Sequence, residues 1–291
     1  MSVLIHTVAS AEAGCTVREL LTARFAISSA LRRELFLRNG AIQLNGKAVF
    51  LSTRVSAGDV LTVDVSDAAE GSAVVPVDYP LTVLWEDEHL LAVDKAAGIT
   101  VHGAALTEET VTVAGAAAHY LGSTAVHVVN RLDRGTSGVM LIAKNGYMHG
   151  RCMTLLHTAD LSREYVAICE GVPSPEQGLI DAPIGRDETS LLRRCIRDDG
   201  QPAMTEYEVL SAHSDRALMR LLPRTGRTHQ LRLHMASIGH PLVGDWLYGT
   251  EDKTLIARPA LHSHRLRFTH PLTGEVIEVT APLPQDMDRL L

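Results

Sequence analysis

The sequence has few cysteines and no long apolar stretch, and both absences exclude classes of protein. Its four cysteines, Cys15, Cys152, Cys169 and Cys195, are widely scattered along 291 residues and form no CxxC pair. A disulfide framework is therefore not expected, and reduced thiols in the cytoplasm fit best. No apolar run approaches about 18 residues, so we expect no membrane span. The first residues also lack a basic start followed by an apolar stretch, so we expect no secretory signal.

The histidines do not form a recognisable metal site. His229 and His234 are five residues apart rather than four, and no HExxH sequence occurs. His262 and His264 alternate on an expected strand, without a cysteine or acidic cluster to complete a ligand set. Neither common phosphate-binding glycine loop is present. The sequence therefore predicts no metal.

The net charge of −7 argues at first against a nucleic-acid partner. The acidic excess, however, lies mainly in residues 67–130, which carry one basic and nine acidic residues. Between Arg131 and Arg232 there are 14 basic residues, and 13 of them are arginine. Arginine suits phosphate contact and stacking on bases, so this segment fits an RNA partner. Arginines that merely solvate a surface are the alternative.

The element pattern divides the chain into two parts joined by a linker. Residues 1–66 are expected to form a small α/β unit. Thr16 and Glu19 have capping-box spacing and start a first helix, and Ser28 or Ser29 caps a second one. Strands are expected at 42–44, 49–51 and 60–65, with an Asn45-Gly46 turn between the first two. Small residues and two prolines mark 67–80 as the linker. Residues 81–291 form the second part.

The second part mixes strands and helices in irregular order. The expected strands are 83–85, 90–93, 126–129, 139–143, 164–169, 204–210, 217–222, 261–268 and 275–280, and the expected helices are 109–121, 148–156 and 229–238. Strands outnumber helices and do not alternate regularly with them. This indicates an α+β fold with a mixed, mostly antiparallel central sheet.

One charged segment, Arg131 to Gly138, lies between two apolar strands. Asp133 stands between Arg131 and Arg134, followed by Gly135 and Thr136. A loop between buried strands can hold a reactive group rigidly, and two arginines would keep a carboxylate ionised, as a nucleophile or base requires. Without further information, a structural Arg–Asp pair at a turn is the competing interpretation.

Residues 1–66 resemble the S4 RNA-binding module. The resemblance rests on the helix Ser28 to Arg38, on 39–47 with its two Asn-Gly pairs, and on Gly58-Asp59-Val60-Leu61. It implies that one basic face meets structured RNA. The residues it places there as candidates for phosphate contact are Arg32, Arg33, Arg38 and Lys47. Side chains that only solvate the helix are the alternative.

The second part resembles the RluA family of pseudouridine synthases, whose central motif is similar to Arg131 through Gly138. Further matching segments follow in order from about Leu81 to the C-terminus: 86–102 with Asp94, Lys95 and Gly98; 162–167 with Tyr165; 199–207; 225–235 with Arg227, His229, Gln230 and Arg232; 239–249; and 261–271 with Leu266. The resemblance implies an RNA-modifying isomerase with the pseudouridine synthase fold. Such an isomerisation is internally redox-neutral, so we expect no cofactor.

The resemblance also implies roles for individual residues. Asp133 would act on the target nucleoside while the N1–C1′ bond breaks and C5 bonds to C1′; attack on the base and action on the sugar both stay open. Tyr165 would stack on the flipped uracil and help remove its C5 proton, and Arg232 would keep Asp133 charged and aimed. Arg131 would fill the gap left by the extruded base, unless it makes a plain phosphate contact. Leu266 would pack under the uracil, unless it is ordinary strand core. The remaining candidates for RNA contact are Arg134, Thr136, Arg227, His229 and Gln230.

Three positions depart from the family pattern. Asn130 stands where the family usually has His, Gly135 where it often has Asp, and Ala96 where Pro is usual in a KPxG-like turn. Asn can still hydrogen-bond but does not titrate near neutrality. We expect a more flexible loop at Gly135 and a looser turn at Ala96.

The predicted function is isomerisation of uridine in structured RNA, with ribosomal RNA of the large subunit as the expected substrate and a monomer as the expected state. A non-catalytic RNA-binding or ribosome-assembly factor on the same fold is the main alternative, although binding alone does not need Asp133, Tyr165 and Arg232 together. A related S4-containing family, RsuA, lacks the segment from Thr225 to His234. A hydrolase built on Asp133 or Ser137 lacks a paired base at recognisable spacing.

Overall fold

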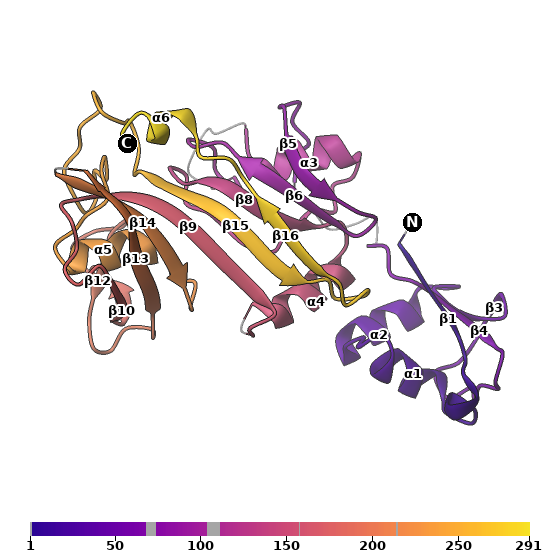
Figure 1. The fold of residues 1–291 in the computed structure, drawn as a ribbon. Coiled ribbons are helices and arrows are strands. Elements are labelled where there is room, and N and C mark those ends of the chain that lie inside the picture. The colour runs from indigo at the N-terminus through magenta and orange to yellow at the C-terminus, as the bar shows by residue number, and fades with distance from the viewer. Residues whose placement is uncertain (1, 68–73, 104–110, 157, 214) are drawn as a thin grey trace.

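The computed structural model describes residues 2–67, 74–103, 111–156, 158–213 and 215–291. Figure 1 shows a small N-terminal unit set to one side of a much larger one, which is built on a long twisted sheet. The small unit holds its own four-stranded sheet, and the large unit holds a ten-stranded sheet and a separate two-stranded one. In the described part of the chain, no helix has both the length and the apolar character that a bilayer crossing requires.

The small unit packs two helices and four short strands around one apolar core. Its sheet is antiparallel in the order β1-β4-β2-β3. The elements are β1 (Val3–Thr7), the 3-10 turn η1 (Ser10–Glu12), α1 (Val17–Ala23), α2 (Ser29–Leu37), β2 (Ile42–Leu44), β3 (Lys47–Ala48) and β4 (Val60–Asp64). Leu21 from α1, Leu35 from α2 and Leu61 from β4 are each at most 1% exposed. The order of elements follows the sequence prediction, apart from β1 and η1, which it did not include.

Local signals explain where these elements begin and turn. The Thr16 hydroxyl accepts from the Glu19 amide, and the Glu19 carboxylate accepts from the Thr16 amide, so the capping box that starts α1 is present. Ser28 caps α2. Asn45 and Gly46 both have positive φ, 51° and 77°, which is the backbone a two-residue hairpin needs. The expected strand at 49–51 was wrong, because pairing with β2 ends at Ala48.

The large sheet runs in the order β10-β13-β14-β9-β15-β8-β6-β5, with β7 beside β8 and β16 beside β15. Every strand pair in it is antiparallel except β8 with β15. Its strands are β5 (Thr82–Glu86), β6 (Leu90–Lys95), β7 (His127–Val128), β8 (Ser137–Ala143), β9 (Leu161–Glu170), β10 (Gln177–Asp181), β13 (Met204–His213), β14 (Arg216–Pro223), β15 (Leu261–Thr269) and β16 (Val276–Thr280). The predicted α+β fold with a mixed, mostly antiparallel sheet is confirmed.

Helices cover both faces of the sheet at β6 and β8, near its β5 edge. Leu91 and Val93 of β6 pack with α3 (Val113–Leu121), while Leu90 and Ala92 pack with α4 (Gly146–Leu155). Because alternate side chains of a strand point to opposite faces, the near-continuous apolar run of β6 is explained by burial on both sides. The expected helix 109–121 begins at Val113; residues 109 and 110 lie outside the described residues.

The remaining elements lie around the far end of the sheet. They are the hairpin of β11 (Ile184–Arg186) and β12 (Arg194–Ile196), helix α5 (Gln230–Ser237) and the C-terminal α6 (Gln285–Asp288). The sequence predicted only α5, because the others are at most four residues long and too short to show a period. In Figure 1, α5 and β12 lie at the end of the large unit opposite the small one.

Gly138 allows β8 and β15 to come together at the centre of the sheet. It has a φ of +110°, and a Cβ built there would lie 2.2 Å from the carbonyl oxygen of Ser263. Only glycine fits so close an approach of two backbones. The β8–β15 pairing pins the end of the loop that carries Asp133.

The two units meet on α4. Tyr147, at its start, is 4% exposed, packs with the core of the small unit, and donates from its hydroxyl to the carbonyl of Phe25 (2.7 Å). Asp67 adds two contacts, since its carboxylate accepts from the Gly146 amide and bonds with the His127 ring, both at 2.9 Å. The other end of α4 reaches the cavity described next.

Candidate active site

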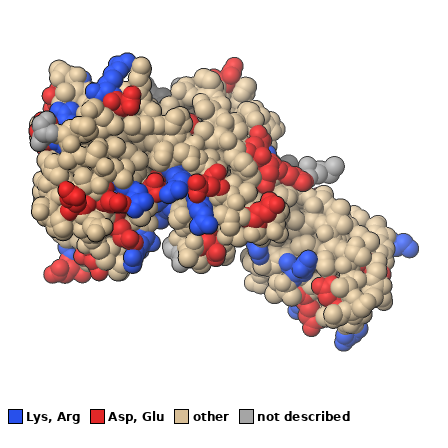
Figure 2. Space-filling model, in the orientation of Figure 1, with Lys and Arg blue, Asp and Glu red and all other residues tan. Residues whose placement is uncertain are grey.

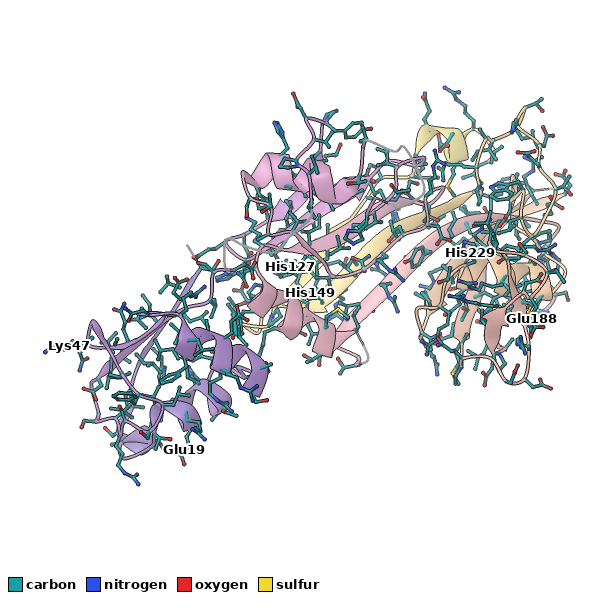
Figure 3. The ribbon with its side chains drawn as sticks, turned by 180° about the vertical axis from the view of Figure 1, so that it is seen from behind. Glu19, Lys47, His127, His149, Glu188 and His229 are labelled. Atoms are coloured by element: carbon teal, nitrogen blue, oxygen red, sulfur yellow. The ribbon has the colours of Figure 1, made fainter. Side chains whose placement is uncertain are left out.

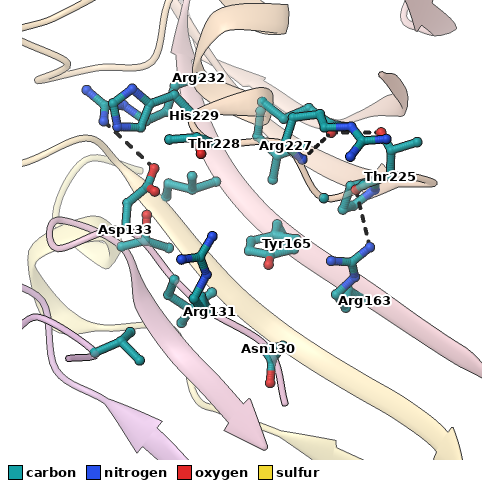
Figure 4. A pocket seen from close by; sticks show the side chains of 18 of the residues that line it. Asn130, Arg131, Asp133, Arg163, Tyr165, Thr225, Arg227, Thr228, His229 and Arg232 are labelled. Carbon is teal, nitrogen blue, oxygen red and sulfur yellow. Dashed lines mark hydrogen bonds and ion pairs between the residues drawn. The ribbon is translucent and has the colours of Figure 1, made fainter. Parts of the chain in front are cut away.

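A cavity of about 560 Å³ opens where the loop before β8, the middle of β9 and the start of α5 come together. Figure 4 shows Arg131, Asp133 and Tyr165 facing into it from one side and Thr228, His229 and Arg232 from another. Eight of the residues predicted from the sequence line it: Arg131, Asp133, Thr136, Tyr165, Arg227, His229, Gln230 and Arg232. The fold thus joins three segments that are remote in sequence.

The loop carrying Asp133 is fixed by backbone contacts on both sides. Within the loop, the Thr136 amide donates to the Asp133 carbonyl (3.0 Å). The Arg134 carbonyl accepts from the Gly98 amide (2.8 Å), and Nε of Arg134 donates back to the Gly98 carbonyl (3.0 Å). A loop held in this way keeps the carboxylate of Asp133, whose side chain is 30% exposed, in one place at the cavity wall.

Lys95, the last residue of β6, hydrogen-bonds to the backbone of the same loop. Its ammonium group donates to the carbonyls of Ala96 (2.9 Å) and Arg134 (3.1 Å), and the residue is 2% exposed. Burial lowers the pKa of Lys95 to about 8, although the negative charge of Asp133 opposes the shift. Lys95 thus adds positive potential near Asp133 without entering the cavity.

Arg232 is held by two carboxylates, and Asp245 is the tighter partner. Nε and Nη2 of Arg232 donate to the two oxygens of Asp245 at 2.7 and 2.6 Å, which is a bidentate pair. Nη1 lies 3.8 Å from Oδ2 of Asp133. Asp245 is fully buried, so it fixes the guanidinium plane and aims the remaining nitrogen at Asp133.

Tyr165 comes from the middle of β9, with Ser263 of β15 and Leu221 of β14 opposite it. It is 6% exposed, and burial raises the pKa of its hydroxyl. The phenol is therefore neutral at physiological pH and presents an aromatic surface to the cavity. Arg163, two residues earlier on the same strand, also lines the cavity and donates to the Thr225 carbonyl (3.2 Å).

His229 enters the cavity from a strained backbone position. It stands at the N-cap of α5 with φ 59°, a left-handed conformation that non-glycine residues rarely adopt. Burial lowers the pKa of its imidazole, with the charge of Asp133 acting in the opposite sense. Gln230 beside it is buried and bonded to Thr225, Met204 and Thr205, so its amide organises the start of α5.

Two predicted residues of the large unit do not line the cavity. Leu266 is 1% exposed, packs in the core with Leu161 and Phe268, and does not line the cavity. Its neighbour in register on β9 is Arg163, which does line it. Arg134 is exposed beside the loop, where its Nε bonds to the turn at Gly98.

The basic residues of the small unit are not brought to the cavity. Figure 3 shows Lys47 at the outer edge of that unit, far from His229. Arg33 and Lys47 are exposed, and Arg32 donates to the Thr22 hydroxyl (2.7 Å). Arg38 differs, because its guanidinium bonds to the backbone carbonyls of Asp64 and Ser66. Arg38 therefore stabilises the end of β4, and its role as a phosphate contact stays a prediction.

Sequence reasoning gave no role to Lys95, Asp245 or Arg163. Signals for two of them were present. Lys95 ends the strand whose apolar run is 90–93, and Arg163 stands two residues before Tyr165, so that Arg163 and Tyr165 face the same side of a strand. Asp245 gave no such signal, because its pairing with Arg232 is a tertiary contact.

Asn130 and Gly135, two of the residues that depart from the family pattern, make contacts that hold the loop. Asn130, 5% exposed, accepts from the Leu141 amide (2.7 Å) and so ties the loop to β8. Gly135 has contacts of its own that hold its backbone. Its carbonyl accepts from Nη1 of Arg258 (3.3 Å), and the space where a Cβ would stand is closed by Pro259 at 3.1 Å. Arg258 is in turn clamped by Asp286 of α6 (2.7 and 2.8 Å).

In residues 2–67, 74–103, 111–156, 158–213 and 215–291, no three His, Cys, Asp or Glu side chains come close enough together to hold a metal ion. The charged and titratable side chains of the cavity wall are instead arginines, two histidines (His102 and His229), one tyrosine and one carboxylate.

Known proteins are similar to this chain over nearly its whole length. An RNA pseudouridine synthase of Bacillus subtilis (strain 168), YjbO, is 37% identical over 279 residues, which cover 95% of this chain and 98% of that protein. Ribosomal large subunit pseudouridine synthase D of Xanthomonas campestris pv. campestris is 35% identical, with 96% and 88% covered. Among solved structures, human RNA Pseudouridylate Synthase Domain Containing 1 matches with a TM-score of 0.59 and 26% identity over 72% of this chain and 93% of that one.

The family comparison agrees with these similarities. The family model for RNA pseudouridylate synthase matches residues 89–237, a range that begins just before β6 and ends with α5. It therefore contains Asp133, Tyr165 and Arg232. The chain belongs to the RNA pseudouridylate synthase family, whose activity is the isomerisation of uridine in RNA.

Proposed function

We propose that this chain converts uridine to pseudouridine in large-subunit ribosomal RNA, with Asp133 as the catalytic carboxylate. The observation that carries the proposal is the meeting of Asp133, Tyr165 and Arg232 in one cavity from three separate segments. A volume of about 560 Å³ is in the range of small-ligand sites and accommodates one extruded nucleoside. A base stacked in a helix has to leave the stack before its glycosidic bond can be reached.

The cavity supports a division of roles. Asp133, 30% exposed, is accessible to a nucleoside, and Nη1 of Arg232 lies 3.8 Å from its carboxylate. Tyr165 offers a buried ring for stacking. Arg131 is exposed at the mouth of the cavity, a position suited to filling the space of the extruded base. While the N1–C1′ bond breaks and C5 bonds to C1′, Asp133 acts on the nucleoside and Tyr165 stacks on the uracil ring. The C5 proton is then lost and N1 gains a proton, so the product is an isomer of uridine.

The small unit is proposed to bind structured RNA as an S4-like domain, comprising residues 1–66 and joined through the linker 67–80. Its exposed Arg33 and Lys47 supply positive charge, and Phe36 and Phe50, 43% and 72% exposed, supply rings for stacking. One face of the large unit, seen in Figure 2, carries interleaved basic and acidic side chains rather than a continuous basic field. Affinity for a large RNA would therefore draw on both units.

Large-subunit ribosomal RNA is proposed because of the relatives. Several of them, such as the Xanthomonas protein, are named ribosomal large subunit pseudouridine synthase D. The wide separation of the small unit from the cavity also suits a substrate larger than a short stem. We further propose that the protein acts as a monomer in the cytoplasm.

The test compares wild type with Asp133→Asn on unmodified large-subunit ribosomal RNA. Wild type should form pseudouridine at defined positions, and the variant should bind the RNA with unchanged affinity but form none. Pseudouridine maps of total RNA from cells with and without the gene then identify the natural position. A variant that still forms product would remove Asp133 from the chemistry. A wild type that binds RNA but never modifies it would favour the non-catalytic alternative.

A further inference from the structure

Tyr248 lies behind the cavity wall, where three segments converge on its side chain. Its hydroxyl accepts a hydrogen bond from the backbone amide of Arg194 in β12 (2.8 Å) and bonds with Nδ1 of His229 (3.0 Å). Its own backbone amide donates to Oδ1 of Asp245 (3.2 Å). It is not among the residues that line the cavity. Any effect of Tyr248 on chemistry therefore passes through its neighbours.

The guanidinium of Arg232 lies over the ring of Tyr248. The central carbon of that guanidinium lies 5.3 Å from the ring centroid, within the range of a cation–π contact. Asp245 binds Arg232 edge-on through both oxygens. A bidentate pair fixes the plane of a guanidinium, and an aromatic ring packed against it restricts its tilt. Tyr248 and Asp245 together leave Arg232 one orientation, with Nη1 toward Asp133.

The hydroxyl of Tyr248 also bonds directly with the imidazole of His229. A backbone amide can only donate, so the phenol oxygen accepts from Arg194, and its single proton is free to point at Nδ1 of His229. Burial lowers the pKa of His229, which favours the neutral imidazole. When the phenol proton points at Nδ1, the neutral ring carries its own proton on Nε2; when Nδ1 is protonated instead, it donates to the phenol. In both arrangements the contact of 3.0 Å fixes the orientation of the ring.

We propose that Tyr248 is a positioning residue for uridine isomerisation, which acts by orienting Arg232 and His229 beside Asp133. This inference rests on the proposed function. The left-handed backbone of His229 supports it, because strain of this kind persists only where surrounding contacts enforce it, and the ring of Tyr248 packs edge-on against that imidazole at 5.7 Å. Tyr248 also connects the β11–β12 hairpin to the site through Arg194.

The test separates the hydroxyl from the ring in the full-length protein. Tyr248→Phe keeps the aromatic ring against Arg232 and removes the hydrogen bonds to His229 and Arg194. Tyr248→Leu removes the ring as well as these two hydrogen bonds. Tyr207→Phe is the matched control, since the Tyr207 hydroxyl donates to the Pro175 carbonyl (3.2 Å) and Tyr207 is absent from the cavity lining. The single-turnover rate constant at saturating ribosomal RNA, the RNA dissociation constant and the melting temperature are measured for each protein.

Of the two hydrogen bonds that Tyr248→Phe removes, the one to His229 reaches the site, and its loss predicts a single-turnover rate about fivefold lower. Further loss of the cation–π contact predicts a reduction of roughly 30-fold in Tyr248→Leu. RNA affinity should stay within twofold of wild type in both variants, and Tyr207→Phe should match wild type in rate. A purely structural residue would lower melting temperature and affinity together instead.

The inference is overturned if Tyr248→Phe reacts within twofold of the wild-type rate, or if its rate falls only as far as its RNA affinity does. Tyr248→Phe decides the question alone if Tyr248→Leu does not fold. Failure of the proposed function gives a different result, because wild type would then form no more pseudouridine than Asp133→Asn.

Discussion

Nη1 of Arg232 lies 3.8 Å from the carboxylate of Asp133, at the long limit of an ion pair and beyond hydrogen-bond distance. The two shorter contacts of Arg232 go to Asp245. Asp133 is therefore near a fixed positive charge but keeps its lone pairs free for a substrate. A carboxylate bound as tightly as Asp245 would have to break that pair before reacting.

Replacing Asp245 should damage both stability and catalysis. Asp245→Asn leaves the guanidinium of Arg232 buried without its counter-charge, and removing one member of a buried pair costs about 3 kcal/mol or more in the free energy of unfolding. Urea unfolding measures this loss. Asp215→Asn is the control, because Asp215 pairs with Arg216 at the surface and should show no measurable change. Equal stability of the two variants would show that Asp245 does not hold Arg232.

Lys95 should make stability depend on alkaline pH. Because burial lowers its pKa from 10.5 to about 8, the unfolded chain binds a proton between these values that the folded protein has released. The free energy of unfolding therefore rises with pH across this window, by about 3 kcal/mol for a shift of this size. Lys95→Met lacks the group and should lack this rise.

The measurement is the difference in unfolding free energy between wild type and Lys95→Met, taken at pH 7.5 and again at pH 10. Wild type should gain on the variant between the two pH values. Lys47→Met, which removes an exposed lysine of the small unit, controls for the loss of a lysine as such. A wild-type advantage that is the same at both pH values would contradict the assignment.

The site could be predicted from the sequence where a residue belongs to a short local motif. Asp133, Tyr165 and Arg232 each stand in a segment with its own pattern, and the fold brings these segments together as the family resemblance implied. Lys95 and Asp245 act through contacts between distant segments, which a local pattern does not encode. Leu266 also stands in a matching motif, but the structure places it in a core cluster away from the cavity lining, a difference that the motif alone does not encode.

The fold, like the site, could be predicted from the sequence only where the signal is local. Strands with a strong apolar period, such as β6, β8 and β9, were predicted at nearly their observed positions, because burial and period have the same cause. The order of the strands in the sheet, and the single parallel contact between β8 and β15, depend on Gly138 and Ser263 meeting across 125 residues. That contact has no local signature beyond a glycine.

Two glycines should respond oppositely to the same substitution. Gly138→Ala places a Cβ 2.2 Å from the backbone oxygen of Ser263 at a φ of +110°, so β8 and β15 must separate, and we expect a loss of about 3 kcal/mol or more. Gly150 lies in α4 with open space around its Cβ position, so Gly150→Ala should stabilise by about 0.5–1 kcal/mol. Thermal melts of both variants provide the comparison. A tolerated Gly138→Ala would mean that β8 and β15 are not in close contact.

Tyr147 should control how firmly the small unit is attached to the large one. Tyr147→Phe removes the hydrogen bond to the Phe25 carbonyl and leaves that carbonyl buried without a partner, at a cost of about 1–2 kcal/mol. Tyr147→Ala also empties the space of a ring that packs with the small unit's core, and should release that unit from α4. Small-angle scattering should then show a larger radius of gyration for Tyr147→Ala.

Releasing the small unit from α4 tests whether that unit contributes to RNA affinity independently of catalysis in the cavity. If the small unit binds RNA, Tyr147→Ala should weaken RNA affinity while the single-turnover rate at saturating RNA stays near wild type, because Asp133, Tyr165 and Arg232 do not contact the junction. Tyr120→Ala, which removes a half-exposed tyrosine of α3 that bonds to Glu86, is the matched control and should leave both the radius and the affinity unchanged. An unaltered radius would show that Asp67 and its contacts with Gly146 and His127 hold the units without Tyr147. A slower rate at saturating RNA would show instead that α4, whose far end carries Met153 at the cavity wall, transmits the state of the junction to the site.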